Sequence, residues 1–161
     1  MDHAGWRSRG YIPHCNAADI IQHITISTIG AESGVEANFG LGLLAHAETA
    51  AIGQGAILHF DDERYRLLAW CVMSNHVHAV VQQIEGWPLA NVVHSWKSFT
   101  ANRINRALGR TGPVWLREYF DRYMRDDDHL AATIFYVEHN PVEAGIVDQA
   151  VQWPWSSAGR R

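Results

Sequence analysis

The chain has 161 residues, of which 47% are hydrophobic and 19% charged, and this is typical of one soluble globular domain spanning residues 1–161. A disordered or low-complexity chain is excluded, because such chains lack the apolar residues that build a core. The 17 acidic and 13 basic residues give a net charge of −4, so the chain is not a polybasic protein that binds nucleic acid through bulk charge alone.

The cysteine content and the lengths of the apolar stretches indicate in which cellular compartment the protein resides. Cys15 and Cys71 are too few for a disulfide framework, which favours a reducing environment. The N-terminal residues lack the layout of a signal peptide, and no stretch approaches the roughly 20 apolar residues that span a bilayer. We therefore expect a cytoplasmic protein with no membrane partner.

The first part of the chain predicts a strand and a helix. Residues 20–28 alternate between β-branched apolar and polar side chains, which is typical of a half-buried strand with Ile24 and Ile26 on one face. Apolar residues between positions 39 and 58 predict a helix, which the glycines among them weaken.

A hairpin and a long helix follow. Residues 65–73 are an apolar, aromatic run, and residues 76–83 alternate between polar and apolar side chains after a short polar turn, which predicts two antiparallel strands. Over residues 88–108 the apolar side chains recur every three or four positions. This helix is expected to start with Pro88 as its first residue and to end at Gly109.

The last third predicts one more strand and one more helix. Residues 115–124 resemble a strand, and the aspartates at 126–128 can cap a helix that ends at Asn140, because Pro141 disfavours helical geometry in the residue before it. The resulting order is strand, helix, two strands, helix, strand, helix. It predicts an α+β fold, a ferredoxin-like antiparallel sheet with helices packed on it.

Two histidines on the predicted hairpin are candidate metal ligands. His76 and His78 are two residues apart on a strand, so both side chains project from the same face. Neutral imidazole is a common metal ligand, and this chemistry alone favours zinc or another transition metal. An ordinary histidine pair on a sheet face is the alternative interpretation.

The last predicted helix carries a tyrosine and an amide on one face. Tyr136 and Asn140 are one turn apart, about 6 Å along the axis. If this face packs on the histidine strand, Asn140 can complete a metal shell and Tyr136 can act as a nucleophile beside the metal. The alternatives are a packing tyrosine and a helix cap before proline, and His139 competes with Asn140 as third ligand.

Two other tyrosines compete with Tyr136 for the nucleophilic role. Tyr119 and Tyr123 lie at even spacing on the predicted strand at 115–124, where they could pack in the core or stack on bases. Tyr136 is favoured because only this tyrosine has a metal-capable residue one helical turn away.

The basic residues are concentrated in one segment. Residues 97–125 contain seven basic and two acidic side chains, although the whole chain is acidic. Arginine binds phosphate through two parallel donors and stacks on bases, so this segment is a candidate DNA-binding surface, and a solvated helix face is the alternative. The candidate DNA-binding residues are Lys97, Arg103, Arg106, Arg110, Arg117 and Arg122.

Several segments form an ordered set of motifs. They are LAWCVMSNHVH at 68–78, NR at 105–106, VW at 114–115, YFDRYMR at 119–125, YVEHNPVEAG at 136–145 and WPWSS at 153–157. In this order they resemble the REP-associated tyrosine transposases of the single-tyrosine HUH superfamily, and the resemblance extends from about residue 9 to residue 157.

The resemblance implies a role for each candidate. His76, His78 and Asn140 would bind a divalent metal, Mg²⁺ or Mn²⁺, and Tyr136 would attack a phosphate of single-stranded or hairpin DNA to form a 5′-phosphotyrosine. It further implies a transposase that is monomeric or homodimeric and associated with the nucleoid.

Two other functions remain open at this point. The chain could be a hairpin-binding module that no longer cleaves nucleic acid, or a metal-dependent hydrolase of small molecules. A covalent protein–DNA adduct distinguishes the transposase from both, since neither alternative forms one.

Overall fold

The computed structural model describes residues 20–30 and 42–160. The elements in chain order are β1 (Ile21–Ser27), α1 (Ala47–His59), β2 (Tyr65–Val72), β3 (His76–Gln83), α2 (Leu89–Leu108), β4 (Phe120–Tyr123), α3 (Asp127–Glu143) and the short 3₁₀ helices η3 (Ala150–Gln152) and η4 (Ser157–Arg160). The motif residues at 9–14, Cys15 and the predicted helical residues 39–41 lie outside the described residues.

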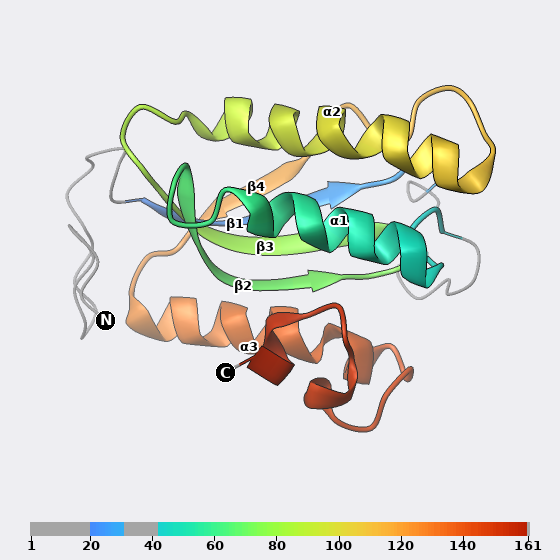
Figure 1. The fold of residues 1–161 in the computed structure, drawn as a ribbon. Helices are drawn as coiled ribbons and strands as arrows, with labels where there is room; N and C mark the ends of the chain where they lie inside the picture. The colour runs from blue at the N-terminus through green and yellow to red at the C-terminus, as the bar shows by residue number, and fades with distance from the viewer. Residues whose placement is uncertain (1–19, 31–41, 161) are drawn as a thin grey trace.

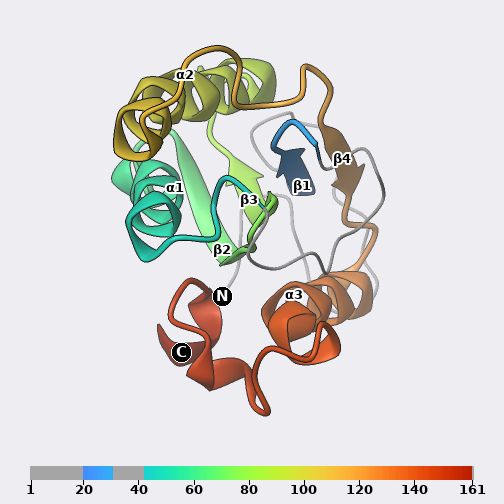
Figure 2. The ribbon, with the colours of Figure 1, turned by 90° about the vertical axis from the view of Figure 1, so that its right-hand side faces the viewer.

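The four strands form one antiparallel sheet in the order β2-β3-β1-β4. Helices α1 and α2 cover one face, and α3 covers the other together with the C-terminal segment (Figures 1 and 2). This arrangement confirms the predicted α+β fold with helices packed on an antiparallel sheet. Among the described residues, no helix has the length and apolar character to cross a membrane.

The residues of β1, β2 and β3 are divided between two separate hydrophobic clusters, one on each face of the sheet. Ile24 and Ile26 of β1 pack in the cluster under α1 and α2, as predicted. Ile21 of β1 and Val80 of β3 pack with Val137 of α3 in the cluster on the opposite face. The period-two alternation of the strands therefore decides which side chains α3 can meet.

The predicted helix near residue 39 begins later than its apolar pattern suggests. Residues 42–46 form turns, and α1 starts at Ala47. The reason is a close approach to the β2–β3 hairpin: the backbone N–H of Leu44 donates to the carbonyl of Ser74 at 2.8 Å. A Cβ atom on Gly42 would lie 1.9 Å from the same carbonyl oxygen, so only glycine fits there.

The hairpin and α2 match their predictions closely, with Pro88 preceding α2 rather than starting it. The predicted strand at 115–124 is shorter, since only Phe120–Tyr123 forms β4. Trp115 makes a single bridge to Thr28 and donates from its indole N–H to Thr100 Oγ1 at 2.8 Å. Packing of this buried tryptophan against α2 keeps the residues before β4 out of the sheet.

The prediction that the last helix ends at Asn140 is wrong, because α3 continues through Pro141 to Glu143. Proline removes one helical N–H donor but leaves its carbonyl available. The carbonyls of Asn140 and Pro141 accept from the N–H groups of Ala144 and Ile146, each at 3.0 Å, so the turn stays hydrogen-bonded. Asn140 is therefore an interior helix residue and not a cap.

Candidate functional site

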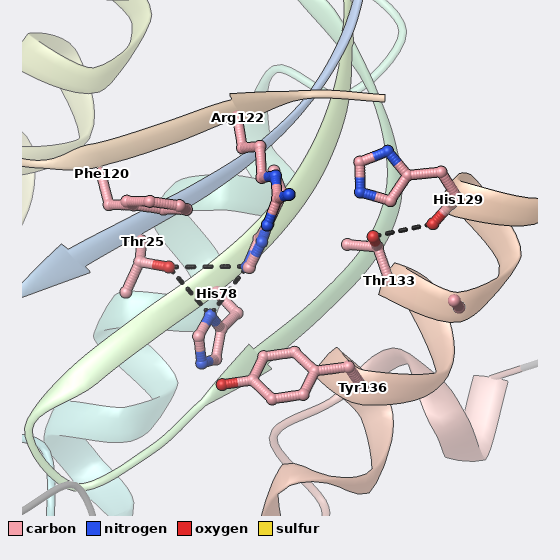
Figure 3. Close-up of a pocket in the computed structure, with 9 residues that line it drawn as sticks. Thr25, His78, Phe120, Arg122, His129, Thr133 and Tyr136 are labelled. Atoms are coloured by element: carbon pink, nitrogen blue, oxygen red, sulfur yellow. Dashed lines mark hydrogen bonds between the residues drawn. The ribbon is translucent and has the colours of Figure 1, made fainter. Parts of the chain in front are cut away.

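A pocket of about 570 Å³ lies between α3 and the strands β1, β3 and β4 (Figure 3). Its lining residues are His23 and Thr25 of β1, His78 of β3, Phe120 and Arg122 of β4, and His129, Ala132, Thr133 and Tyr136 of α3. Four secondary-structure elements, of which only β4 and α3 are consecutive in the chain, thus supply one polar and aromatic cavity.

His76 and His78 lie on the α3 face of β3, as the alternation predicts. Each is only 3% exposed, and their ring centroids are 4.7 Å apart. Opposite them on β1 stand Ser27 and Thr25, whose small polar side chains leave room for the two rings. The strand therefore holds two imidazoles side by side beneath the helix.

Hydrogen bonds orient both rings. The Nδ1 of His76 lies 2.8 Å from Asn75 Oδ1, which can only accept, so Nδ1 carries the proton and Nε2 has the lone pair. The Nδ1 of His78 lies 3.0 Å from Thr25 Oγ1 and 3.0 Å from His23 Nε2. Its buried Nε2 makes no hydrogen bond within the described residues.

Burial keeps His78 and its neighbour His23 neutral. Burial and the nearby His76 and His23 hold the pKa of His78 well below its usual value. Burial, together with the charges of Arg122 and His129, lowers the pKa of His23 to about 4. Neutral imidazole is the form that binds a metal, so these conditions suit a ligand.

Tyr136 approaches the histidines from α3. Its ring centroid lies 5.6 Å from that of His78 and 6.2 Å from that of His23, and its hydroxyl points toward His78 (Figure 3). The side chain is 47% exposed, so a ligand in the pocket can reach the hydroxyl. Tyr136 is thus placed beside the imidazole pair and open to solvent.

The two rival tyrosines lie elsewhere. Tyr119 packs at the edge of the cluster under α1 and α2, on the other side of the sheet. Tyr123 lies on the face of β4 opposite to that of the pocket residues Phe120 and Arg122. It pairs with Gln22 of β1, whereas Arg122 pairs with the pocket residue His23. Of the three candidates, only Tyr136 lines the pocket.

The two candidates for a third metal ligand differ in burial. Asn140 is 9% exposed and lies one turn beyond Tyr136, on the side of α3 where Val137 packs on the sheet. His139 stacks on Phe135, with centroids 3.7 Å apart, and its Nδ1 lies 3.0 Å from the Phe135 carbonyl. The structure therefore places Asn140, rather than His139, on the buried side of the helix.

Residues 20–30 and 42–160 contain no group of three or more histidine, cysteine, aspartate or glutamate side chains that could hold a metal. An ion at His76 and His78 would need further ligands of another kind, such as an amide oxygen or an oxygen of the substrate. Of the three predicted ligands, His76 and His78 lie side by side, and Asn140 lies on α3 one turn beyond Tyr136.

The predicted DNA-binding residues are divided between the two sides of the sheet. Arg122 lines the pocket. The residues of α2 and of the segment after it lie on the α1/α2 side (Figures 1 and 2); these are Lys97, Arg103, Arg106, Arg110 and Arg117. The predicted basic segment thus does not form one surface around the histidines.

Several of these basic groups already have intramolecular partners. Lys97 donates to the carbonyls of Leu116 and Arg117 at 2.8 and 3.2 Å. Arg110 donates to Asn105 Oδ1 at 2.6 Å, and the Arg103 guanidinium lies 3.9 Å from the centroid of the Phe99 ring. Such contacts give these side chains a role in stability beside any role in binding.

Sequence reasoning missed six residues of the pocket, which are His23, Thr25, Phe120, His129, Ala132 and Thr133. The signal for His23 and Thr25 was present, because they alternate with Ile24 and Ile26 on the polar face of β1. Phe120 and His129 carried no such signal, since their position depends on how β4 and α3 meet in space.

Comparison with known proteins places the chain in a family. The family model described as "Transposase IS200 like" matches residues 56–140, which is more than half of the chain. A Haemophilus influenzae protein assigned to the REP-associated tyrosine transposases is 27% identical over 106 residues, and the match covers 60% of each chain. The match thus spans less than two thirds of that relative.

The fold has a counterpart among solved structures. A REP-associated tyrosine transposase bound to a REP hairpin superimposes with a TM-score of 0.68 at 19% identity, over 96% of this chain and 83% of the other. At this identity the likeness concerns the fold alone, and the family match over residues 56–140 carries the assignment. The chain belongs to the IS200-like transposase family.

Proposed function

We propose that this protein cleaves and rejoins single-stranded DNA beside a hairpin, with Tyr136 as the nucleophile. The observation that carries the proposal is the position of the Tyr136 hydroxyl, which points toward the buried His78 from an open pocket. Family membership and a similarly folded transposase that is bound to a REP hairpin support this choice of substrate.

His76, His78 and Asn140 are the proposed ligands of a divalent metal. The residues fit such an ion: Nε2 of His78 is buried without a hydrogen bond in the described part of the chain, and Asn75 directs the lone pair of His76 to Nε2. Imidazole and amide donors together suit Mn²⁺ at least as well as Mg²⁺. When bound, the metal would polarise the scissile phosphate.

In the proposed reaction, the Tyr136 oxygen attacks phosphorus. The Tyr136 O–P bond forms, the P–O3′ bond breaks, and the phenolic proton ends on the 3′-oxygen as a free 3′-hydroxyl. A free phenol has a pKa of about 10, so a nearby cation is needed to favour the phenolate, and Arg122 lines the same pocket. No water is consumed, so a 3′-hydroxyl can reverse the reaction and rejoin the strand.

The test is a covalent-adduct assay. The full chain is mixed with Mn²⁺ and a 5′- and 3′-labelled oligonucleotide that carries a hairpin, and the products are separated under denaturing conditions. We expect an adduct that contains only the 3′ part of the strand, because the tyrosine retains the 5′-phosphate. Tyr136→Phe should abolish it, whereas Tyr123→Phe, a matched loss of one exposed hydroxyl outside the pocket, should not.

Other outcomes would contradict the proposal. An adduct that persists in Tyr136→Phe removes this residue from the nucleophilic role. Hairpin binding without any adduct identifies a module that only binds DNA. Turnover of DNA with water and no adduct identifies a hydrolase.

A further inference from the structure

The wall of the pocket opposite Tyr136 contains an exposed aromatic ring on an edge strand. Phe120 is 53% exposed, and β4 is the last strand of the sheet. Its described ring contact is with His23, at 6.0 Å between centroids and 72° between planes, so no ring in the described residues stacks parallel on it. Phe120 therefore offers aromatic surface to a ligand in the pocket.

The next pocket-facing residue of β4 is a cation. Arg122 lies two residues from Phe120, about 7 Å along an extended strand. Within the described residues no carboxylate pairs with Arg122, and its charge contributes to lowering the pKa of both His23 and His129. The described part of the chain thus leaves the guanidinium able to bind an anion, and phosphate is an anion whose geometry it matches.

His129 supplies a second donor at the same wall. The backbone N–H of Arg125 donates to its Nδ1 at 3.1 Å, so the proton of the neutral ring is on Nε2. Burial and the charges of Arg125 and Arg122 lower the pKa of His129, which favours this neutral form. Nε2–H can therefore donate to a phosphate oxygen beside Arg122.

The cavity has the size for such a ligand. Its volume of about 570 Å³ lies within the range of small-molecule sites, roughly 300–1,000 Å³. The wall presents an aromatic ring and, about one strand repeat away, a cation and a neutral donor. A nucleotide has the same two parts, a flat base and a phosphate, at a comparable separation.

We propose that this pocket holds one unpaired nucleotide of the substrate strand, with its base stacked on Phe120 and its phosphate bound by Arg122 and His129. The inference rests on the proposed function, because it places the neighbouring phosphate at the Tyr136 hydroxyl. Every base has a flat face, so stacking tolerates sequence changes, and a base paired in a duplex is already stacked between its neighbours. Phe120 would thus select unpaired nucleotides rather than a particular base.

The test is a binding scan in a protein that cannot cleave. Tyr136→Phe protein is titrated with hairpin oligonucleotides whose single-stranded extension carries one abasic residue, moved position by position. We expect one position at which loss of the base weakens binding roughly 5- to 100-fold, the range for base–aromatic stacking. With Phe120→Ala added, the intact oligonucleotide should bind more weakly and this abasic penalty should disappear.

Matched variants separate stacking from general damage. Phe120→Trp should restore the penalty. Phe135→Ala removes a phenyl ring that is 60% exposed and does not line the pocket, so it should leave the scan unchanged. Arg122→Gln should make the slope of log affinity against log salt concentration less steep, by the amount expected for the loss of about one phosphate contact. Arg66→Gln, the same charge change on the opposite edge strand β2, should not.

The outcomes distinguish the two proposals. The nucleotide pocket is overturned if DNA binds but no abasic position weakens binding, or if Phe120→Ala leaves the abasic penalty unchanged. Either result leaves the proposed function intact. Failure of the protein to bind any hairpin or single-stranded oligonucleotide overturns the proposed substrate, and the pocket assignment with it.

Discussion

The face of the sheet under α1 and α2 differs from the face under α3 in the chemistry of its buried side chains. The first is mainly apolar and includes Trp96 and Ile104 of α2. The second carries a smaller apolar cluster and, beside it, the buried His76 and His78, with the open pocket at its edge. Alternate residues of the same strands therefore contribute to an apolar core on one side and to the candidate site on the other.

The polar face carries an energetic cost. A buried polar atom without a hydrogen bond costs roughly 1–3 kcal/mol, and the atoms of this kind in the described residues include His78 Nε2 and Gln82 Oε1 on that face. A protein tolerates such atoms where a ligand satisfies them or where the opposite face supplies enough apolar burial. The contrast predicts that mutations on the two faces affect different properties.

The largest expected effect is on the polar face. His78→Ala should reduce adduct formation by more than about 100-fold, because it removes a proposed ligand beside the nucleophile. Loss of a buried polar side chain should change the free energy of unfolding less than loss of an apolar one. Denaturing gels measure the adduct, and urea unfolding measures the stability.

Ile104→Ala is the matched truncation on the apolar face, where this side chain is 0% exposed. We expect a loss of about 2–5 kcal/mol in the free energy of unfolding, with the adduct yield per folded molecule retained. If Ile104→Ala abolishes the adduct in folded protein, or if His78→Ala is the more destabilising of the two, the division between the faces is wrong.

A smaller effect is expected for Thr25, which positions a proposed ligand. Thr25→Val removes the hydroxyl that lies 3.0 Å from His78 Nδ1, so the ring loses part of its orientation. Groups that orient a ligand typically contribute 10- to 100-fold to metal affinity, and we expect a loss of that order in calorimetric titration with Mn²⁺. Thr25→Ser should restore affinity, and equal Mn²⁺ binding by Thr25→Val would exclude the positioning role.

The smallest effect is expected at the start of α3, the helix that carries both His129 and Tyr136 of the pocket. The Asp126 carboxylate accepts from the backbone N–H of His129 at 2.7 Å and caps the helix. Asp126→Ala should therefore cost about 1 kcal/mol of stability, visible as a lower melting temperature, whereas Asp126→Asn should keep most of it. A melting temperature unchanged by Asp126→Ala would show that packing alone positions the first turn of α3.

Local patterns in the sequence predicted β1, the β2–β3 hairpin, α2, the start of α3 and the relative direction of neighbouring side chains. The alternation of a strand placed His76 and His78 on one face, and the helical period aligned Tyr136 with Asn140. These relations depend only on positions a few residues apart, so backbone geometry suffices to predict them.

The tertiary structure decided which of these faces meet. It brought Tyr136 to His78, added His23 and Phe120 to the pocket, and placed Arg122 in the pocket beside α3, whereas Arg103 belongs to α2, which covers the other face of the sheet. It also carried α3 past Pro141, since later N–H groups keep the carbonyls hydrogen-bonded. Contacts of this kind join residues far apart in the chain and arise from burial of apolar surface, which is non-directional. A local apolar pattern therefore shows which face of an element is buried, but not which other element covers it.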